Sequence, residues 1–178
     1  VIAAAGGGLD DWQTAICGQL YVMPAAKARR FHLPIGLPVE DGFLRAMVLT
    51  DALTGPEDFS RIGGAADVFH IYASERTVAA LIRHQTRIVI GSAINFACFS
   101  ALVAVPKAQR HDELARAAAN AGWLAQVIKA QLPRAPFGFV PGHFLTKRLA
   151  RALATPRATL RPKRLAITVL GFGFDLIV

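Results

Sequence analysis

The sequence predicts an α/β fold, from two segments with strand character and one segment of helical periodicity between them. Residues 12–23 are apolar and partly β-branched, which is typical of a buried strand. Residues 67–73 alternate well enough to form a second strand. Residues 39–53 repeat apolar side chains at helical spacing and place Glu40 and Asp41 in the first turn.

Further helices are predicted around these segments. A short helix follows Pro24 over residues 25–30, and three breakers then make residues 32–38 a loop. Another helix begins near Ser74 or Thr77, either of which can cap it, and runs through Gln85 toward residues 88–105.

Residues 88–105 form an uncharged stretch of 18 residues, slightly shorter than the roughly 20 that a bilayer core requires. A small polar stripe of Gly91, Ser92 and Asn95 inside it favours packing against protein over a membrane span. Two amphipathic helices are expected at 123–132 and 143–153. The second is basic beside a wide apolar face, so it suits a membrane interface as well as an ordinary protein surface.

The net charge of +8 is divided unevenly along the chain. Residues 1–106 carry 8 basic and 9 acidic side chains, whereas residues 107–178 carry 12 basic and 3 acidic ones. We therefore expect two parts, a nearly neutral one at 1–106 and a basic helical one at 107–178. The basic part could face the phosphates of anionic lipids or of nucleic acid.

The cysteine content and the hydrophobic content exclude several classes of protein. With 53% hydrophobic residues, the chain is not a disordered one. Cys17 and Cys98 are too few for a disulfide scaffold, and no Cys/His cluster suggests zinc, so a reducing compartment is expected.

Two groups of residues could carry chemistry. Glu40 and Asp41 follow a Gly/Pro loop, where they either cap a helix or supply a general base at the mouth of a pocket. The run His84-Gln85-Thr86-Arg87 places hydrogen-bond donors on adjacent helix faces, with Arg83 one turn before Arg87. It suits either phosphate binding or a solvated polar surface.

The order of these groups resembles the later half of a family 2 glycosyltransferase, over about residues 12–105. Gly18-Gln19-Leu20-Tyr21 is similar to the family's G-x-x-Y strand, Glu40-Asp41 to its E-D pair, and His84-Gln85-Thr86-Arg87-Ile88 to its Q-x-x-R-W motif. His84 stands where the family has Gln, and Ile88 stands where it has Trp. The resemblance implies the C-terminal part of a GT-A type domain at 1–106, followed by helices that associate with a membrane.

The resemblance also implies an activity, namely inverting transfer of a sugar from a nucleotide-sugar to an acceptor hydroxyl. Asp41 matches the catalytic base. Glu40, Tyr21, His84, Gln85 and Arg87 match positions that contact substrate. A divalent cation, Mg²⁺ or Mn²⁺, is implied too, but its D-x-D ligands are missing, because Asp10-Asp11 lacks that spacing.

Only 39 residues precede Glu40, which is too few for the family's nucleotide- and metal-binding half. The chain therefore resembles a fragment that is expected to be inactive alone. Membrane association at the cytoplasmic face is the expected location.

The alternative is a non-enzymatic module in which residues 107–178 bind anionic membrane surfaces. Nucleic-acid binding is not expected, because the basic residues are accompanied by few aromatic ones and by no recognised binding motif.

Overall fold

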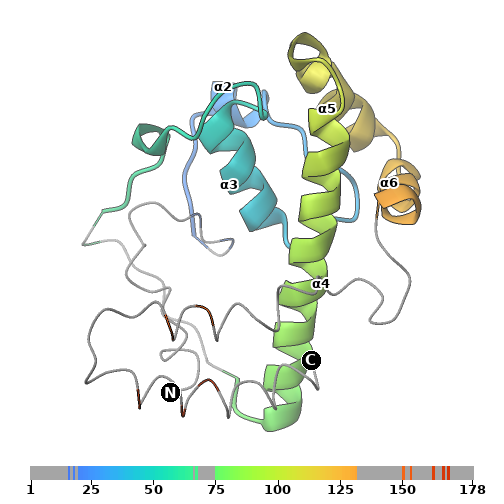
Figure 1. Cartoon of the computed structure of the whole chain (residues 1–178). Helices are drawn as coiled ribbons and strands as arrows, with labels where there is room; N and C mark the ends of the chain where they lie inside the picture. The colour runs from blue at the N-terminus through green and yellow to red at the C-terminus, as the bar shows by residue number, and fades with distance from the viewer. Residues whose placement is uncertain are drawn as a thin grey trace. The chain divides into compact units, whose positions relative to one another are not determined.

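The structure, a computed structural model, describes residues 16, 18, 20–65, 67, 75–131 and the separate positions 150, 153, 162, 166 and 168. Within these residues the order of elements is α2 (Ala25–Ala28), α3 (Glu40–Thr50), η2 (Phe59–Arg61), α4 (Val78–Val103), η3 (Lys107–Gln109), α5 (Arg110–Ala119) and α6 (Trp123–Gln131). The described part of the chain is mainly helical, and the described residues between its helices form turns and loops (Figure 1).

The α/β prediction is wrong, because the described part of the chain is helical and Leu20 is the one residue there with a β-bridge. In the predicted first strand, Leu20, Tyr21 and Val22 are exposed, and Val22 is 96% accessible. A short apolar run does not by itself distinguish a strand from another conformation, since a strand also needs a paired neighbour and a face to bury. The same finding removes the GT-A domain as the architecture of residues 1–106. The predicted second strand lies outside the described residues, apart from Asp67.

Helix α3 forms where the periodicity predicted a helix. Its buried side chains are Phe43, Leu44, Met47, Val48, Leu49 and Thr50. The helix ends earlier than predicted, because Asp51, Ala52 and Leu53 all adopt a left-handed backbone with φ between 51° and 61°. The hydroxyl of Thr50 accepts a hydrogen bond from the Leu53 amide at 2.8 Å, which ties this turn to the helix.

Helix α4 combines the predicted helix that follows Thr77 with the uncharged stretch after it. The Thr77 hydroxyl accepts a hydrogen bond from the Ala80 amide at 3.1 Å, which confirms the predicted N-terminal cap. Asn95, Cys98 and Leu102 then recur at helical spacing, and each is at most 5% exposed. In the described residues α4 is the one helix long and apolar enough to cross a membrane, but it is partly buried in the protein, as the core helix of a soluble protein also is.

The chain divides into two compact units. The first comprises Val1–Ala73 and Ile94–Leu132, and the second comprises Ser74–Ala93 and Pro133–Val178. Helix α4 therefore begins in the second unit and ends in the first.

The core of the first unit lies between α3, the end of α4, α5 and α6. The rings of Phe43 and Phe99 stack with centroids 5.2 Å apart, which joins α3 to α4. Leu114 of α5 is fully buried, as are Cys98 and Leu102. In Figure 1, α3 lies on one side of the end of α4, and α5 and α6 lie on the other.

Helices α5 and α6 are joined by a polar contact. The indole Nε1 of Trp123 donates a hydrogen bond of 2.7 Å to the Glu113 carboxylate. Helix α6 confirms the amphipathic helix predicted at 123–132, whereas α5 was not predicted. The predicted helix at 143–153 lies outside the described residues, apart from positions 150 and 153.

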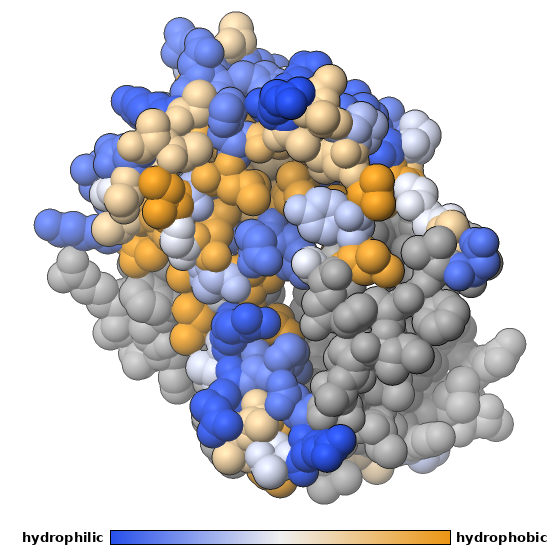
Figure 2. Space-filling view, turned by 180° about the vertical axis from the view of Figure 1, so that it is seen from behind, coloured by the Kyte–Doolittle hydropathy of each residue, from blue (hydrophilic) through white to orange (hydrophobic). Residues whose placement is uncertain are grey.

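Hydrophobic and hydrophilic side chains are interspersed on the face drawn in Figure 2. Large hydrophobic side chains exposed in the described residues are Leu20, Tyr21, Val22, Ile35, Phe59, Val78, Phe96, Val103 and Leu153. On α4, Phe96 and Val103 are seven residues apart and therefore share one side of the helix.

Candidate functional site

The acidic pair Glu40-Asp41 occupies the first turn of α3, as the sequence predicted. Val39 is the N-cap residue and provides no side-chain hydrogen bond to the helix. Asp41 fills part of that role, because its Oδ1 accepts a hydrogen bond of 2.7 Å from the Gly42 amide. The positive end of the helix dipole favours negative charge at this position. One oxygen of the Asp41 carboxylate is thus anchored.

Gly18 lies against this carboxylate. A Cβ atom added to Gly18 would stand 3.2 Å from Asp41 Oδ2, 3.4 Å from Asp41 Cβ and 3.5 Å from Glu40 Oε1. The first distance is tighter than most real Cβ contacts, so a glycine is the residue that fits here without a shift of the carboxylate. The structure therefore brings the glycine of Gly18-Gln19-Leu20-Tyr21 next to the E-D pair, although more than twenty residues separate them in the sequence.

Tyr21 is the other residue predicted from that segment. Its side chain is 50% exposed, and it lies three residues beyond Gly18. The ring is accessible to a ligand from solvent, but the described contacts do not include one between Tyr21 and the acidic pair.

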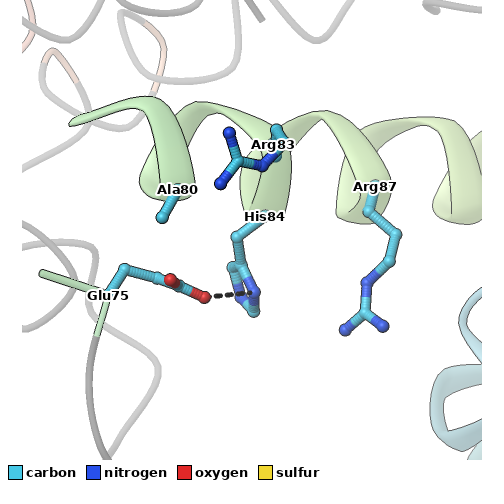
Figure 3. Close-up of a pocket in the computed structure, with 5 residues that line it drawn as sticks. All are labelled: Glu75, Ala80, Arg83, His84 and Arg87. Atoms are coloured by element: carbon cyan, nitrogen blue, oxygen red, sulfur yellow. Dashed lines mark ion pairs between the residues drawn. The ribbon is translucent and has the colours of Figure 1, made fainter. Parts of the chain in front are cut away.

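The second group of predicted residues forms a cluster at the start of α4, in the second unit. Glu75, Ala80, Arg83, His84 and Arg87 line an open cavity of about 360 Å³ (Figure 3). His84 Nδ1 and Glu75 Oε1 are 3.5 Å apart, an ion pair when the imidazole is protonated. His84 and Arg87 leave the same side of α4, and Glu75 faces His84.

This cavity suits an anion. Arg83 and Arg87 are four residues apart, so their side chains leave α4 one helical turn from each other. Guanidinium groups bind phosphate oxygens through charge-assisted hydrogen bonds, and the imidazole adds another donor. Gln85, also predicted to contact substrate, is half-buried and is not among the residues that line the cavity.

Two members of this cluster were not among the predicted site residues. Arg83 was predicted only as a neighbour of Arg87, and no role was predicted for Glu75. The i, i+4 spacing of the two arginines was the available signal for Arg83. No local sequence pattern predicts that Glu75 pairs with His84, which lies nine residues later in the chain.

The acidic pair and the arginine cluster belong to different units of the chain. The structure brings Gly18, Glu40 and Asp41 together in the first unit. It brings Glu75, Arg83, His84 and Arg87 together in the second.

The described residues do not fit the divalent cation that the sequence resemblance implies. Nowhere in the described ranges do three or more His, Cys, Asp or Glu side chains form a group that could hold a metal ion. Asp10 and Asp11 lie outside these ranges. No catalytic step is therefore derived through a metal.

Asn95 was noticed in the sequence only as part of a small polar stripe on an apolar helix, and that stripe predicted packing against protein. The structure agrees at this residue, which is 5% exposed. Its Nδ2 donates a hydrogen bond of 2.8 Å to the backbone carbonyl of Val39, immediately before the acidic pair.

Comparisons of the chain with protein-family models, with curated proteins and with solved structures found no match.

Proposed function

We propose that this chain supplies the catalytic carboxylate of an inverting glycosyltransferase, which moves a sugar from a nucleotide-sugar donor to an acceptor hydroxyl. The observation that supports it best is the contact between Gly18 and the Asp41 carboxylate at the start of α3. Two motifs that resemble those of family 2 glycosyltransferases in order thus also meet in space. The proposal rests on this site and not on the α/β architecture, which the described residues do not have.

Asp41 acts in this proposal as the general base. Its Oδ2 accepts the proton of the acceptor hydroxyl while the hydroxyl oxygen attacks the anomeric carbon of the donor. The bond from that carbon to the diphosphate oxygen breaks with its electron pair, which leaves on the nucleoside diphosphate, and the configuration inverts. A positioned general base contributes roughly 10²- to 10⁴-fold to such a reaction.

The anchoring of one carboxylate oxygen supports this role. Gly42 holds Oδ1 through its amide, and the other oxygen, Oδ2, is the atom closest to the position of a Cβ on Gly18. A side chain at position 18 would compete with an acceptor for the space beside Oδ2. Glycine leaves that space open.

The arginine cluster has a separate role in the proposal. Arg87, together with His84, binds an anionic ligand in the second unit. The cavity is lined by two guanidinium groups and one carboxylate, so it carries an excess of positive charge. This excess favours an anionic ligand.

The test uses the full-length gene product with a panel of UDP-, GDP- and dTDP-hexoses, and with lipid and sugar alcohols as acceptors. Release of nucleoside diphosphate measures turnover, and equilibrium dialysis measures donor binding. Asp41→Asn, which keeps the shape of the side chain but removes the base, should lower turnover by at least about 100-fold. Donor binding should not change. Glu57→Gln, at an exposed position after α3 and outside the proposed site, is the control and should retain most of the turnover.

Two results would contradict the proposal. One is wild-type turnover in Asp41→Asn. The other is the absence of sugar transfer by the wild-type protein with every donor in the panel.

We also propose, as a second candidate, that the basic part at 107–178 associates with anionic membrane surfaces. The side chains of Phe96 and Val103 on α4 are exposed, 69% and 55% accessible, and could add apolar contacts to a membrane surface. Membrane binding of this kind does not depend on Asp41. It predicts binding to vesicles of anionic phospholipid that weakens as salt is added, equally in wild type and in Asp41→Asn.

A further inference from the structure

Asn95 is a polar side chain in an apolar position. It is 5% exposed, and it shares a face of α4 with Cys98 and Leu102, which are fully buried. Burial of an amide is unfavourable unless its donors and acceptors find partners. A leucine of similar size would fill this place without that cost, so the amide needs another reason to be there.

The partner of the amide supplies the reason. Asn95 Nδ2 donates to the carbonyl oxygen of Val39 at 2.8 Å, and Val39 is the N-cap residue of α3. The same nitrogen would lie 3.5 Å from a Cβ added to Gly42. The amide group therefore rests directly against the first turn of α3, which consists of Glu40, Asp41 and Gly42.

The other end of the amide is not satisfied. Asn95 Oδ1 is buried and has no hydrogen-bond partner within the described ranges. Asn95 thus makes one hydrogen bond to the end of α3 and leaves one buried acceptor unpaired. The unpaired acceptor offsets much of the stability that the bond provides. The clear effect of the bond is that it fixes the position of the start of α3 against α4.

That position matters because of what the first turn carries. A slip of α3 by one residue would move Asp41 by 1.5 Å along the axis and turn it by about 100°. An error of about 1 Å in the placement of a catalytic group can cost roughly 100-fold in rate. The bond from Asn95 to the Val39 backbone carbonyl joins α4 to this end of α3, whereas the Asp41 carboxylate bonds within α3, to the Gly42 amide.

We infer that Asn95 is a positioning residue for Asp41, which holds the catalytic carboxylate in place through its bond to the Val39 carbonyl. This inference rests on the proposed function for the role of Asp41, but the bond itself can be tested independently of activity.

The experiment compares Asn95→Leu with a control that is buried on the same face, Leu102→Ala, in the full-length gene product. Circular dichroism and thermal unfolding verify that each variant folds. The ¹³C chemical shifts of the Val39 carbonyl and of the Asp41 carboxyl, obtained by selective labelling, report the first turn of α3. Turnover and the KM for the donor are measured with the nucleotide-sugar of the panel that the wild type uses best.

Asn95→Leu should move both ¹³C signals and lower kcat by about 10- to 100-fold, with the donor KM unchanged. Leu102→Ala should lower the thermal midpoint without moving either signal, and its kcat should stay near that of the wild type. If Asn95→Leu does not fold, Asn95→Ser takes its place, because its hydroxyl is too short to reach the carbonyl.

The inference is overturned if the folded Asn95 variant has wild-type ¹³C signals, or if Leu102→Ala shifts them equally. It is also overturned if kcat of the Asn95 variant does not fall in an active enzyme. Absence of turnover in the wild type would remove the proposed function, while the ¹³C signals would still decide whether Asn95 holds the first turn.

Discussion

The guanidinium group of Arg110, at the start of α5, donates a hydrogen bond to the backbone carbonyl of Leu53, in the turn after α3. The same group donates to the carbonyls of Val103 and Val105 at 3.1 and 3.0 Å. Arg110 is 7% exposed, so one buried cation caps the end of α4 and holds a loop 57 residues away in the sequence. The loop needs such support, because a left-handed backbone costs roughly 1–2 kcal/mol at each residue that is not glycine.

Replacement of Arg110 by methionine should lower the free energy of unfolding by about 3 kcal/mol, because buried carbonyls would lose their donor. Arg110→Lys should recover only part of this, since one ammonium group cannot span three acceptors as the guanidinium does. Urea denaturation measures the effect. Lys107→Met, at an exposed position of η3, is the control and should change stability by less than about 0.5 kcal/mol. Equal stabilities of Arg110→Met and Lys107→Met would contradict the role of Arg110.

Glu113 should make the stability of the first unit depend on acid. Burial opposes ionisation of this carboxyl, but hydrogen bonds from Arg116 and Trp123 outweigh it and hold the pKa below its ordinary value of 4.5. Because the pKa of Glu113 is lower in the folded state, its ionised carboxylate stabilises the fold. This contribution to the free energy of unfolding is complete above about pH 4.5 and is lost as the pH falls through the pKa of the folded state. Glu113→Gln should therefore flatten the decline in unfolding free energy below pH 5, as measured by urea titrations from pH 7 to pH 3. A decline as steep as in the wild type would exclude Glu113 as its source.

Cys98 should be unreactive in the folded protein. The residue is fully buried, and burial raises the pKa of its thiol to about 12, whereas the thiolate is the reactive form. In a Cys17→Ser background, iodoacetamide at pH 8 should leave Cys98 unmodified in buffer and alkylate it completely in 6 M guanidinium, as followed by mass spectrometry. Because the folded pKa is raised above 9.0, this residue should also destabilise the fold progressively from about pH 9 to pH 12. Rapid alkylation in buffer would show that the α4 face is open in solution.

Gly18→Ala should impair transfer without unfolding the chain. The added methyl group would stand 3.2 Å from Asp41 Oδ2, so the carboxylate has to move away from it. We expect a fall in kcat of about 10-fold, measured in the nucleotide-release assay, because the base leaves its working position. Gly63→Ala is the matched control, since a Cβ at that glycine has no neighbour within 4 Å. Equal activities of the two alanine variants would mean that the Gly18 contact has no part in catalysis.

Sequence-based predictions were correct where they depended on residues close in the chain and wrong where they depended on distant ones. Apolar spacing predicted α3, α4 and α6, and Thr77 was one of the two predicted caps of α4, because these features depend on residues within one or two helical turns. The strand predicted at 12–23 is not formed by its described residues, apart from the β-bridge at Leu20. Strand formation depends on a distant partner and on burial of one face, and neither can be read from a short apolar segment.

The sequence by itself therefore determined helices α3, α4 and α6, the concentration of positive charge in residues 107–178 and the place of Glu40-Asp41 at a helix start. Only the tertiary structure decided that Gly18 contacts the Asp41 carboxylate, that Asn95 bonds to the Val39 carbonyl and that Arg110 holds the turn at Leu53. Each of these contacts joins residues far apart in the chain. Such contacts form only when packing of the core has compensated the entropy lost in closing the loop between them, so no local pattern specifies them.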